Sequence, residues 1–229
     1  DGKVHFLTDI MRQGENSGII YLADRAIKGL PIHYGTYNNA VVIDEDMLTD
    51  DFLIQSPIIL TCKNATRETI NSYLRDLRGV KSKLPMHGEP VICRKNNWSI
   101  ECDGINLVNG LRGTVENFPD VSSRGSERNI FKIDFRQGRL LFRDVKCDYD
   151  YFNADYDDKN RLRNSPYSPG NKIELAYAIT THLSQGSQYY SGIFIEEWLR
   201  KDVMPNLIYT GITRFSDYMI YVKRKPKFY

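Results

Sequence analysis

The chain has 229 residues, of which 41% are hydrophobic and 26% charged, and its net charge is only +2. This composition is typical of a globular protein with one large domain or two small ones. The charge neither requires nor excludes a nucleic-acid partner, although it permits a local basic patch. No apolar run approaches the roughly 20 residues that a membrane span needs, so we expect no membrane partner.

The cysteines and histidines give no sign of a metal site. None of the four cysteines lies in a C-x-x-C pair, and the four histidines are scattered. This pattern favours a reduced, intracellular protein without zinc. The sequence begins with Asp1-Gly2 instead of an initiator Met, so we expect a piece of a longer protein.

The first ninety residues alternate between helix and strand patterns. Asn16 or Ser17 can cap a helix that ends at Gly29. The elements expected next are a strand at 40–43, a strand at 58–61, a helix that Asn64 caps and Gly79 ends, and a strand at 90–94.

The middle of the chain changes character. From about residue 93 to 167 short strands alternate with Gly, Asn and Asp turns, which suggests a small β-barrel. Residues 108–111, Val-Asn-Gly-Leu, carry a hairpin signal. Two alternating runs, 130–135 and 140–145, should pair through the turn between them. The acidic, Tyr-rich stretch 148–164 is expected to be a long surface loop.

The last part returns to α/β patterning. We expect strands at 175–181, 193–195 and 218–222, and a helix near 205–213. The sequence therefore predicts an α/β domain that a β insertion interrupts.

Residues 176–188, AYAITTHLSQGSQ, form the strongest local pattern. An apolar strand delivers Thr181 and His182 onto a polar turn, at the strand end where α/β sheets bind ligands. Taken alone, a Thr-His pair is more often a capped turn with a satisfied histidine.

A second pattern, LIYTGITR at 207–214, ends a helix on Arg214 just before a strand. An Arg there can bind phosphate oxygens with its planar fork, although a helix-terminal Arg more often offsets the helix dipole. A third, LTDIMRQ at 7–13, has no meaning by itself.

In this order and spacing the three patterns resemble motifs IV, V and VI of superfamily 1 helicases. The most similar branch is the RecD-like DNA helicases of bacteria and phages. The resemblance extends to TCKNATR at 61–67, GEPVICRKNNW at 88–98 and VNGLRGTV at 108–115, and so covers most of the chain.

The resemblance implies an α/β, RecA-like second motor domain with a small inserted Src-homology-3-like β-barrel. Residues 1–92 and 168–229 would form the motor domain, and 93–167 the barrel. The partner would be an N-terminal RecA-like domain that binds most of the ATP and Mg²⁺. The expected location is the cytoplasm of a bacterium or phage-infected cell.

The family's residue roles carry over position by position. Arg12 and Arg214 would contact the γ-phosphate of ATP, Arg214 as the arginine finger that stabilises transition-state charge. Three more residues would lie at the nucleotide: Gln13, Gly186 and Gln188. The residues expected to face single-stranded DNA are Thr61, Lys63, Asn64, Thr181 and His182.

Two positions depart from the family pattern. Leu183 stands where a Lys is usual, which removes one cation, and Gly211 replaces an Ala, which weakens a helix by about 1 kcal/mol. No G-x-x-x-x-G-K-[ST] occurs, so the chain alone is predicted to be inactive as an ATPase. The run 41–45, VVIDE, imitates a Walker B strand, but it follows motif IV and is more simply the start of an acidic helix.

Two other classes of function remain open. The chain could be a stand-alone binding module for protein or nucleic acid with a relic motor fold, which Leu183 and the missing P-loop favour slightly. A nuclease or hydrolase is the third alternative, but the spacing of the Asp residues in 148–158 fits neither an EF-hand nor a two-metal site.

Overall fold

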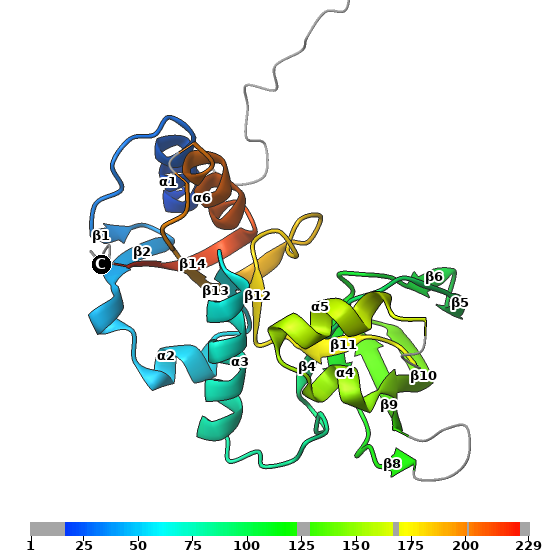
Figure 1. Cartoon of the computed structure of the whole chain (residues 1–229). Helices are drawn as coiled ribbons and strands as arrows, with labels where there is room; N and C mark the ends of the chain where they lie inside the picture. The colour runs from blue at the N-terminus through cyan, green and yellow to red at the C-terminus, as the bar shows by residue number, and fades with distance from the viewer. Residues whose placement is uncertain (1–16, 123–128, 167–169, 201, 225–229) are drawn as a thin grey trace, which may run out of the picture. The chain divides into compact units, whose positions relative to one another are not determined.

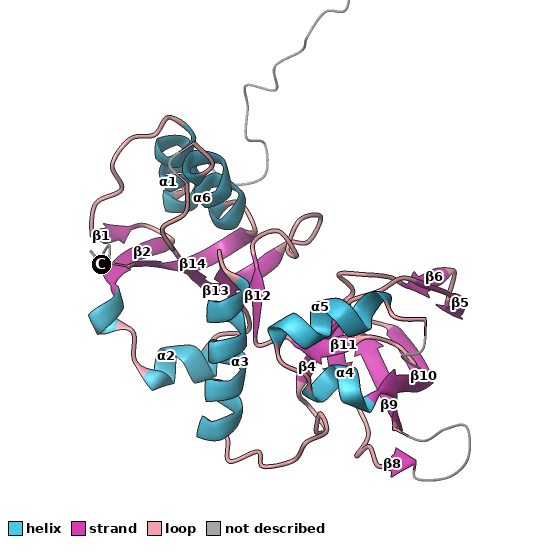
Figure 2. Cartoon of the chain, in the orientation of Figure 1, coloured by secondary structure: helices cyan, strands magenta, loops and turns pink. Residues whose placement is uncertain are grey.

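The structure is a computed structural model that describes residues 17–122, 129–166, 170–200 and 202–224. It forms two compact units, one from the described parts of Asp1–Lys63 and Ile179–Tyr229, the other from Asn64–Ala178. Figure 2 shows helices and strands in both units. The sequence-based boundaries at 92 and 168 remain a prediction.

The first unit is built on a six-stranded sheet with the order β1-β2-β14-β13-β3-β12. The pairs β2–β14, β14–β13 and β13–β3 are parallel, and β1 pairs antiparallel with β2. The strands are β1 (Gly35–Tyr37), β2 (Ala40–Asp44), β3 (Ile59–Thr61), β12 (Ala178–Thr180), β13 (Tyr189–Ile195) and β14 (Phe215–Lys223). The predicted mixed α/β fold with a parallel sheet is confirmed.

Helices complete this unit. α1 (Gly18–Ile27) and α6 (Met204–Ile212) pack against each other and against β14 (Figure 1). The hydroxyl of Ser17 accepts a hydrogen bond from the Ile20 amide, which confirms the expected N-cap. A 3-10 turn η1 (Glu45–Met47) and α2 (Asp50–Gln55) follow β2, so the segment that imitates Walker B does lead into an acidic helical start.

The second unit begins with α3 (Asn64–Leu77) and contains a sheet of order β10-β9-β7-β4-β11. Its pairs are all antiparallel, and β8 adds to β9. The strands are β4 (Pro90–Cys93), β7 (Arg112–Val115), β8 (Val121–Ser122), β9 (Ile130–Gln137), β10 (Leu140–Asp148) and β11 (Ile173–Leu175). A separate hairpin joins β5 (Asn97–Cys102) to β6 (Ile105–Leu107). Closure of these strands into a barrel remains a prediction.

Three local predictions were wrong. Residues 108–111 make a turn, with the Leu111 amide donating to the Val108 carbonyl, but β6 and β7 on either side do not pair with each other. The strand expected at 175–181 is two strands, because β11 pairs with β4 whereas β12 joins the other sheet. A continuous apolar run does not indicate that the chain passes from one sheet to another within it.

The third error concerns the acidic stretch 148–164, which is not a loop. It forms α4 (Tyr149–Asn153) and α5 (Tyr156–Asn164). Asp148 and Asp155 cap these helices by accepting the amides of Tyr151 and Asp158. Asp favours helix N-caps as strongly as it favours turns, so its abundance alone could not separate the two.

Candidate nucleotide-facing and DNA-facing site

Arg214 follows Thr213, the C-cap of α6, and is partly buried. Its guanidinium donates from Nε to the Thr210 carbonyl at 3.1 Å, from Nη1 to the Ser187 carbonyl at 3.2 Å, and from Nη2 to the Thr213 hydroxyl at 3.4 Å. All three acceptors are neutral, and Arg214 makes no ion pair within the described ranges. The guanidinium is therefore oriented but keeps its full charge, as a phosphate contact requires.

The turn after β12 meets Arg214 through the backbone. The Tyr189 amide donates to the Arg214 carbonyl at 2.7 Å, beside the Ser187 bond. Gly186, with φ +84°, and Gln188 flank Ser187 and are exposed. Of the five residues expected at the nucleotide, Gly186, Gln188 and Arg214 thus lie close together in the structure. The other two, Arg12 and Gln13, lie outside the described residues.

Thr61 and Thr181 join the ends of β3 and β12. Thr181 donates to the Thr61 carbonyl from its amide at 2.8 Å and from its hydroxyl at 3.1 Å. Both side chains are buried, so neither hydroxyl is open to a DNA strand in this structure. The exposed side chains at this edge are those of Lys63 and His182. Neither forms an ion pair with another described residue.

Asn64 is the fifth residue expected at DNA, and it opens α3 in the other unit. It is half-buried, and its side-chain amide donates to the Tyr156 hydroxyl at 3.1 Å. Tyr156 is the first residue of α5, so this hydrogen bond connects the starts of α3 and α5.

Glu197 is a central residue that sequence reasoning missed. It is only 3% exposed, and its Oε2 accepts the amides of Cys62 at 2.9 Å and Lys63 at 2.8 Å. These amides follow the end of β3 and would otherwise have been available to a phosphate. The sequence offers no signal for this, because an acidic pair after an apolar strand is usually a solvated edge.

Arg224 completes the support of Glu197. Its Nη1 donates to Glu197 Oε1 at 3.2 Å, and its Nε lies 3.3 Å from Glu45 Oε2. The carboxylate thus binds one cation and two backbone amides, which offset the cost of its burial. Beside it, burial raises the pKa of the Cys62 thiol to about 12, so this cysteine stays protonated and unreactive at neutral pH.

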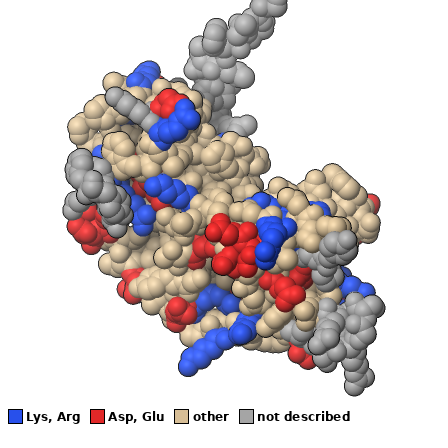
Figure 3. Space-filling view, viewed as in Figure 1, with Lys and Arg blue, Asp and Glu red and all other residues tan. Residues whose placement is uncertain are grey.

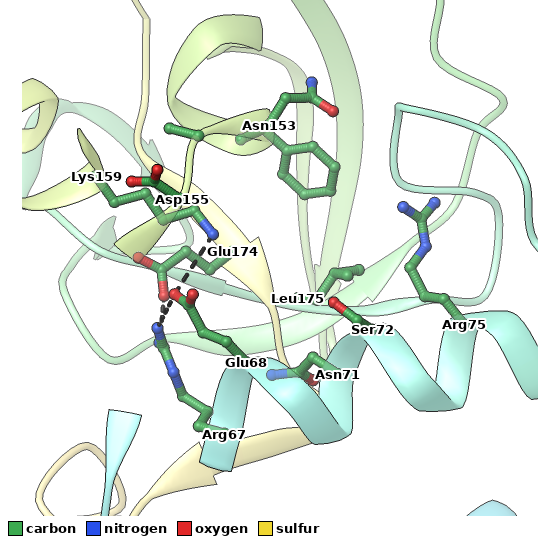
Figure 4. A pocket seen from close by; sticks show the side chains of 12 residues that line it. Arg67, Glu68, Asn71, Ser72, Arg75, Asn153, Asp155, Lys159, Glu174 and Leu175 are labelled. Atoms are coloured by element: carbon green, nitrogen blue, oxygen red, sulfur yellow. Dashed lines mark hydrogen bonds and ion pairs between the residues drawn. The ribbon is translucent and has the colours of Figure 1, made fainter. Parts of the chain in front are cut away.

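The second unit holds a cavity of about 360 Å³ between α3, the α4–α5 segment and β11 (Figure 4). Arg67 and Glu174 form a buried ion pair there, and Glu68 pairs with both Arg67 and Lys159. Glu174 also accepts the Tyr151 hydroxyl at 2.5 Å. Burial alone would raise the pKa of Glu174, but Arg67, Arg94 and the Tyr151 hydrogen bond together lower it below its usual value.

Charge on the surface is mixed. On the face in Figure 3, Lys and Arg atoms are interspersed with Asp and Glu atoms and form no single basic patch. Within the described ranges, no three His, Cys, Asp or Glu side chains are grouped so that they could hold a metal ion. No helix in the part of the chain that the structure describes has the length and apolar character to cross a membrane.

No protein-family model and no curated protein sequence matches the chain. Solved structures do match it in fold. A Bacteroides Pif1 helicase with ADP-AlF3 and single-stranded DNA superposes with a TM-score of 0.51 at 17% identity, over 94% of this chain and 51% of that one. Pif1 helicases from a study of forked DNA unwinding give 0.54 at 18%, over 94% and 49%.

A third match, Bacteroides Pif1 bound to single-stranded DNA, gives a TM-score of 0.51 at 18% identity, over 94% of this chain and 50% of that one. The chain therefore spans about half the length of the Pif1 structures. At this identity the likeness shows the fold alone: the chain has the mixed α/β fold, with a parallel sheet, of a RecA-like motor domain.

Proposed function

We propose that the chain is the second motor half of an ATP-dependent DNA helicase of superfamily 1, of the RecD-like branch. The observation that carries this proposal is the placement of Arg214, whose uncompensated guanidinium is held by the carbonyls of Thr210 and Ser187. The fold shared with about half of each Pif1 helicase structure supports it, as does the ordered motif set.

In this proposal Arg214 is the arginine finger. Hydrolysis of a phosphoanhydride bond is accelerated when a fixed cation stabilises charge on the transferring group. Arg214 fits that task because its three hydrogen-bond acceptors are neutral and leave its charge for a phosphate. Arg12, Gln13, Gly186 and Gln188 would complete this side of the nucleotide.

ATP and Mg²⁺ would be bound mainly by an N-terminal RecA-like domain of the full-length protein. The residues of this chain suit only the phosphate-facing side, since it carries no P-loop lysine or adjoining Ser/Thr. Mg²⁺ would neutralise charge on the phosphates when bound. We therefore propose that the 229-residue chain alone does not hydrolyse ATP, and that 93–167 form an inserted Src-homology-3-like barrel.

Single-stranded DNA would bind at the exposed edge beyond β3 and β12. Lys63 and His182 would contact phosphates, Asn64 would contribute from α3, and the buried Thr61 and Thr181 would shape the edge. Binding of this kind is weak, independent of sequence and strongly dependent on salt. The test is titration of a labelled oligonucleotide with the chain at two salt concentrations. An affinity that does not change with salt concentration, or a strong preference for one sequence, would contradict the proposal.

A further inference from the structure

Trp198 has an exposed indole on an anchored stretch of backbone. Trp198 is 53% exposed, whereas the preceding Glu197 is only 3% exposed. Its ring packs on no other aromatic ring within the described ranges. The exposed indole is therefore accessible to a ligand, and its surroundings decide which ligand it suits.

The backbone on both sides of Trp198 is fixed. The Glu196 amide donates to the Val222 carbonyl at 2.9 Å, and the Glu196 carboxylate accepts the Tyr221 hydroxyl at 2.9 Å. On the other side, the Leu199 amide lies 3.4 Å from Met204 Sδ. The backbone at Trp198 is therefore hydrogen-bonded on both sides, and little of it would need to become ordered on binding a ligand.

Trp198 also lies next to the exposed cation at the end of β3. The carboxylate of Glu197 binds the Lys63 amide at 2.8 Å, which ties the two segments together. β13 and β3 are parallel neighbours with Phe194 opposite Leu60, and continuing this register places residue 197 beside Lys63. The backbone segments that carry Trp198 and Lys63 are thus neighbours at one sheet edge.

The carboxylates near Trp198 would repel a polyanion such as DNA only weakly. Glu197 is compensated by Arg224 and two amides. Glu196 bonds to Tyr221, and burial raises the pKa of its carboxyl. The cation of this edge, Lys63, has no ion pair among the described residues.

We propose that Trp198 is a stacking platform for one base of single-stranded DNA, next to a phosphate that Lys63 binds. This inference rests on the proposed function and names a contact residue outside the three helicase motifs. Single-strand-binding proteins combine cations along the backbone with aromatic rings under the bases, because every base has a π-face. An exposed indole and an unpaired lysine on neighbouring backbone segments provide both parts of this arrangement.

The chain has only two tryptophans, which allows a direct test. Trp98 lies on β5 in the other unit and is 68% exposed, so it is a matched control. In Trp98→Phe protein, titration with an oligo-dT strand should quench the remaining indole, because a stacked base quenches its fluorescence. A strand with abasic sites throughout keeps the phosphates, and it should bind without this quenching.

Affinity measurements complete the test. Trp198→Ala should weaken binding roughly 5- to 100-fold, and Trp198→Phe much less, because the Phe ring still stacks. The salt dependence should stay as in the unmodified chain, since no charge is lost. If the chain binds DNA but Trp198→Ala binds equally well and no quenching occurs, the stacking proposal is wrong while the proposed function stands. If the chain binds no single strand at all, both are wrong.

Discussion

The Nη1 of Arg214 donates to the carbonyl of Ser187 at 3.2 Å, which joins the end of α6 to the turn after β12. The Tyr189 amide returns a bond to the Arg214 carbonyl at 2.7 Å. A movement of Ser187, which lies in the turn that we expect to sense DNA, would therefore stretch or break its bond to Arg214. In the proposed helicase, this contact would provide a physical route that couples DNA binding to ATP hydrolysis.

If the full-length protein is the proposed helicase, replacement of Arg214 in it should remove most of the hydrolysis rate. We expect Arg214→Ala to lower kcat by about 10³, with DNA affinity nearly unchanged, because an arginine finger acts mainly on the transition state. Arg214→Lys should recover little, since Lys lacks the planar fork. Arg200→Ala is the control, because Arg200 is exposed and pairs with Asp202. Steady-state ATPase assays measure these rates. Normal turnover by Arg214→Ala would refute the assignment of Arg214 as the arginine finger.

Side-chain packing explains why position 211 is Gly and not the Ala of the helicase motif. A Cβ built there would lie 2.5 Å from Cε2 of Phe194, whose ring is fully buried. Gly211→Ala should gain about 1 kcal/mol of helix propensity but lose about 1–3 kcal/mol to overpacking. We expect a net loss in the free energy of unfolding of about 1 kcal/mol.

The control for this prediction is a double-mutant cycle. In a Phe194→Leu background the ring is gone, so Gly211→Ala should become stabilising. Denaturant unfolding of the four proteins measures the sign in each background. If Gly211→Ala stabilises the chain that keeps Phe194, the Phe194 ring can move aside at little cost and the prediction is wrong.

Lys63→Ala should reduce the salt dependence of single-strand binding. One lost phosphate contact lowers the slope of log K against log salt by about 1. Lys28→Ala is the matched control, since Lys28 already pairs with Asp24. Equal slopes for the Lys63→Ala and unmodified chains would exclude Lys63 from the phosphate contacts.

The buried carboxylate of Glu174 should make the second unit sensitive to acid. Its pKa is lowered in the folded state, so its stabilising contribution is present above the ordinary value of 4.5 and is lost as the pH falls through the lowered pKa. Glu174→Gln should cost about 3 kcal/mol at pH 7, because Arg94 would lose its carboxylate partner and Arg67 would keep only Glu68.

Thermal unfolding from pH 7 to pH 3 checks this prediction. The gap between the unmodified and Glu174→Gln proteins should narrow below about pH 4.5. Glu101→Gln, a change at an exposed position in the same unit, should follow the unmodified protein throughout. A gap that stays constant with pH would contradict the role given to the carboxylate.

The sequence predicted several elements that depend on local signals, although it missed α4 and α5, which Asp148 and Asp155 cap. Ser17 caps α1, α6 ends just before Arg214, and the hairpin of β9 and β10 forms through the turn at 138–139. It did not predict the contacts that depend on long-range pairing. Glu197 lies 134 positions from Lys63, and the change of sheet between β11 and β12 depends on which neighbours each strand meets.

The central claim is that this chain supplies the arginine finger but not the nucleotide cradle. The most direct measurement is ATP hydrolysis with saturating single-stranded DNA, for the 229-residue chain alone and for the full-length protein. The account predicts no turnover by the chain alone and DNA-stimulated turnover by the full-length protein, which Arg214→Ala abolishes. Robust hydrolysis by the chain alone would contradict it.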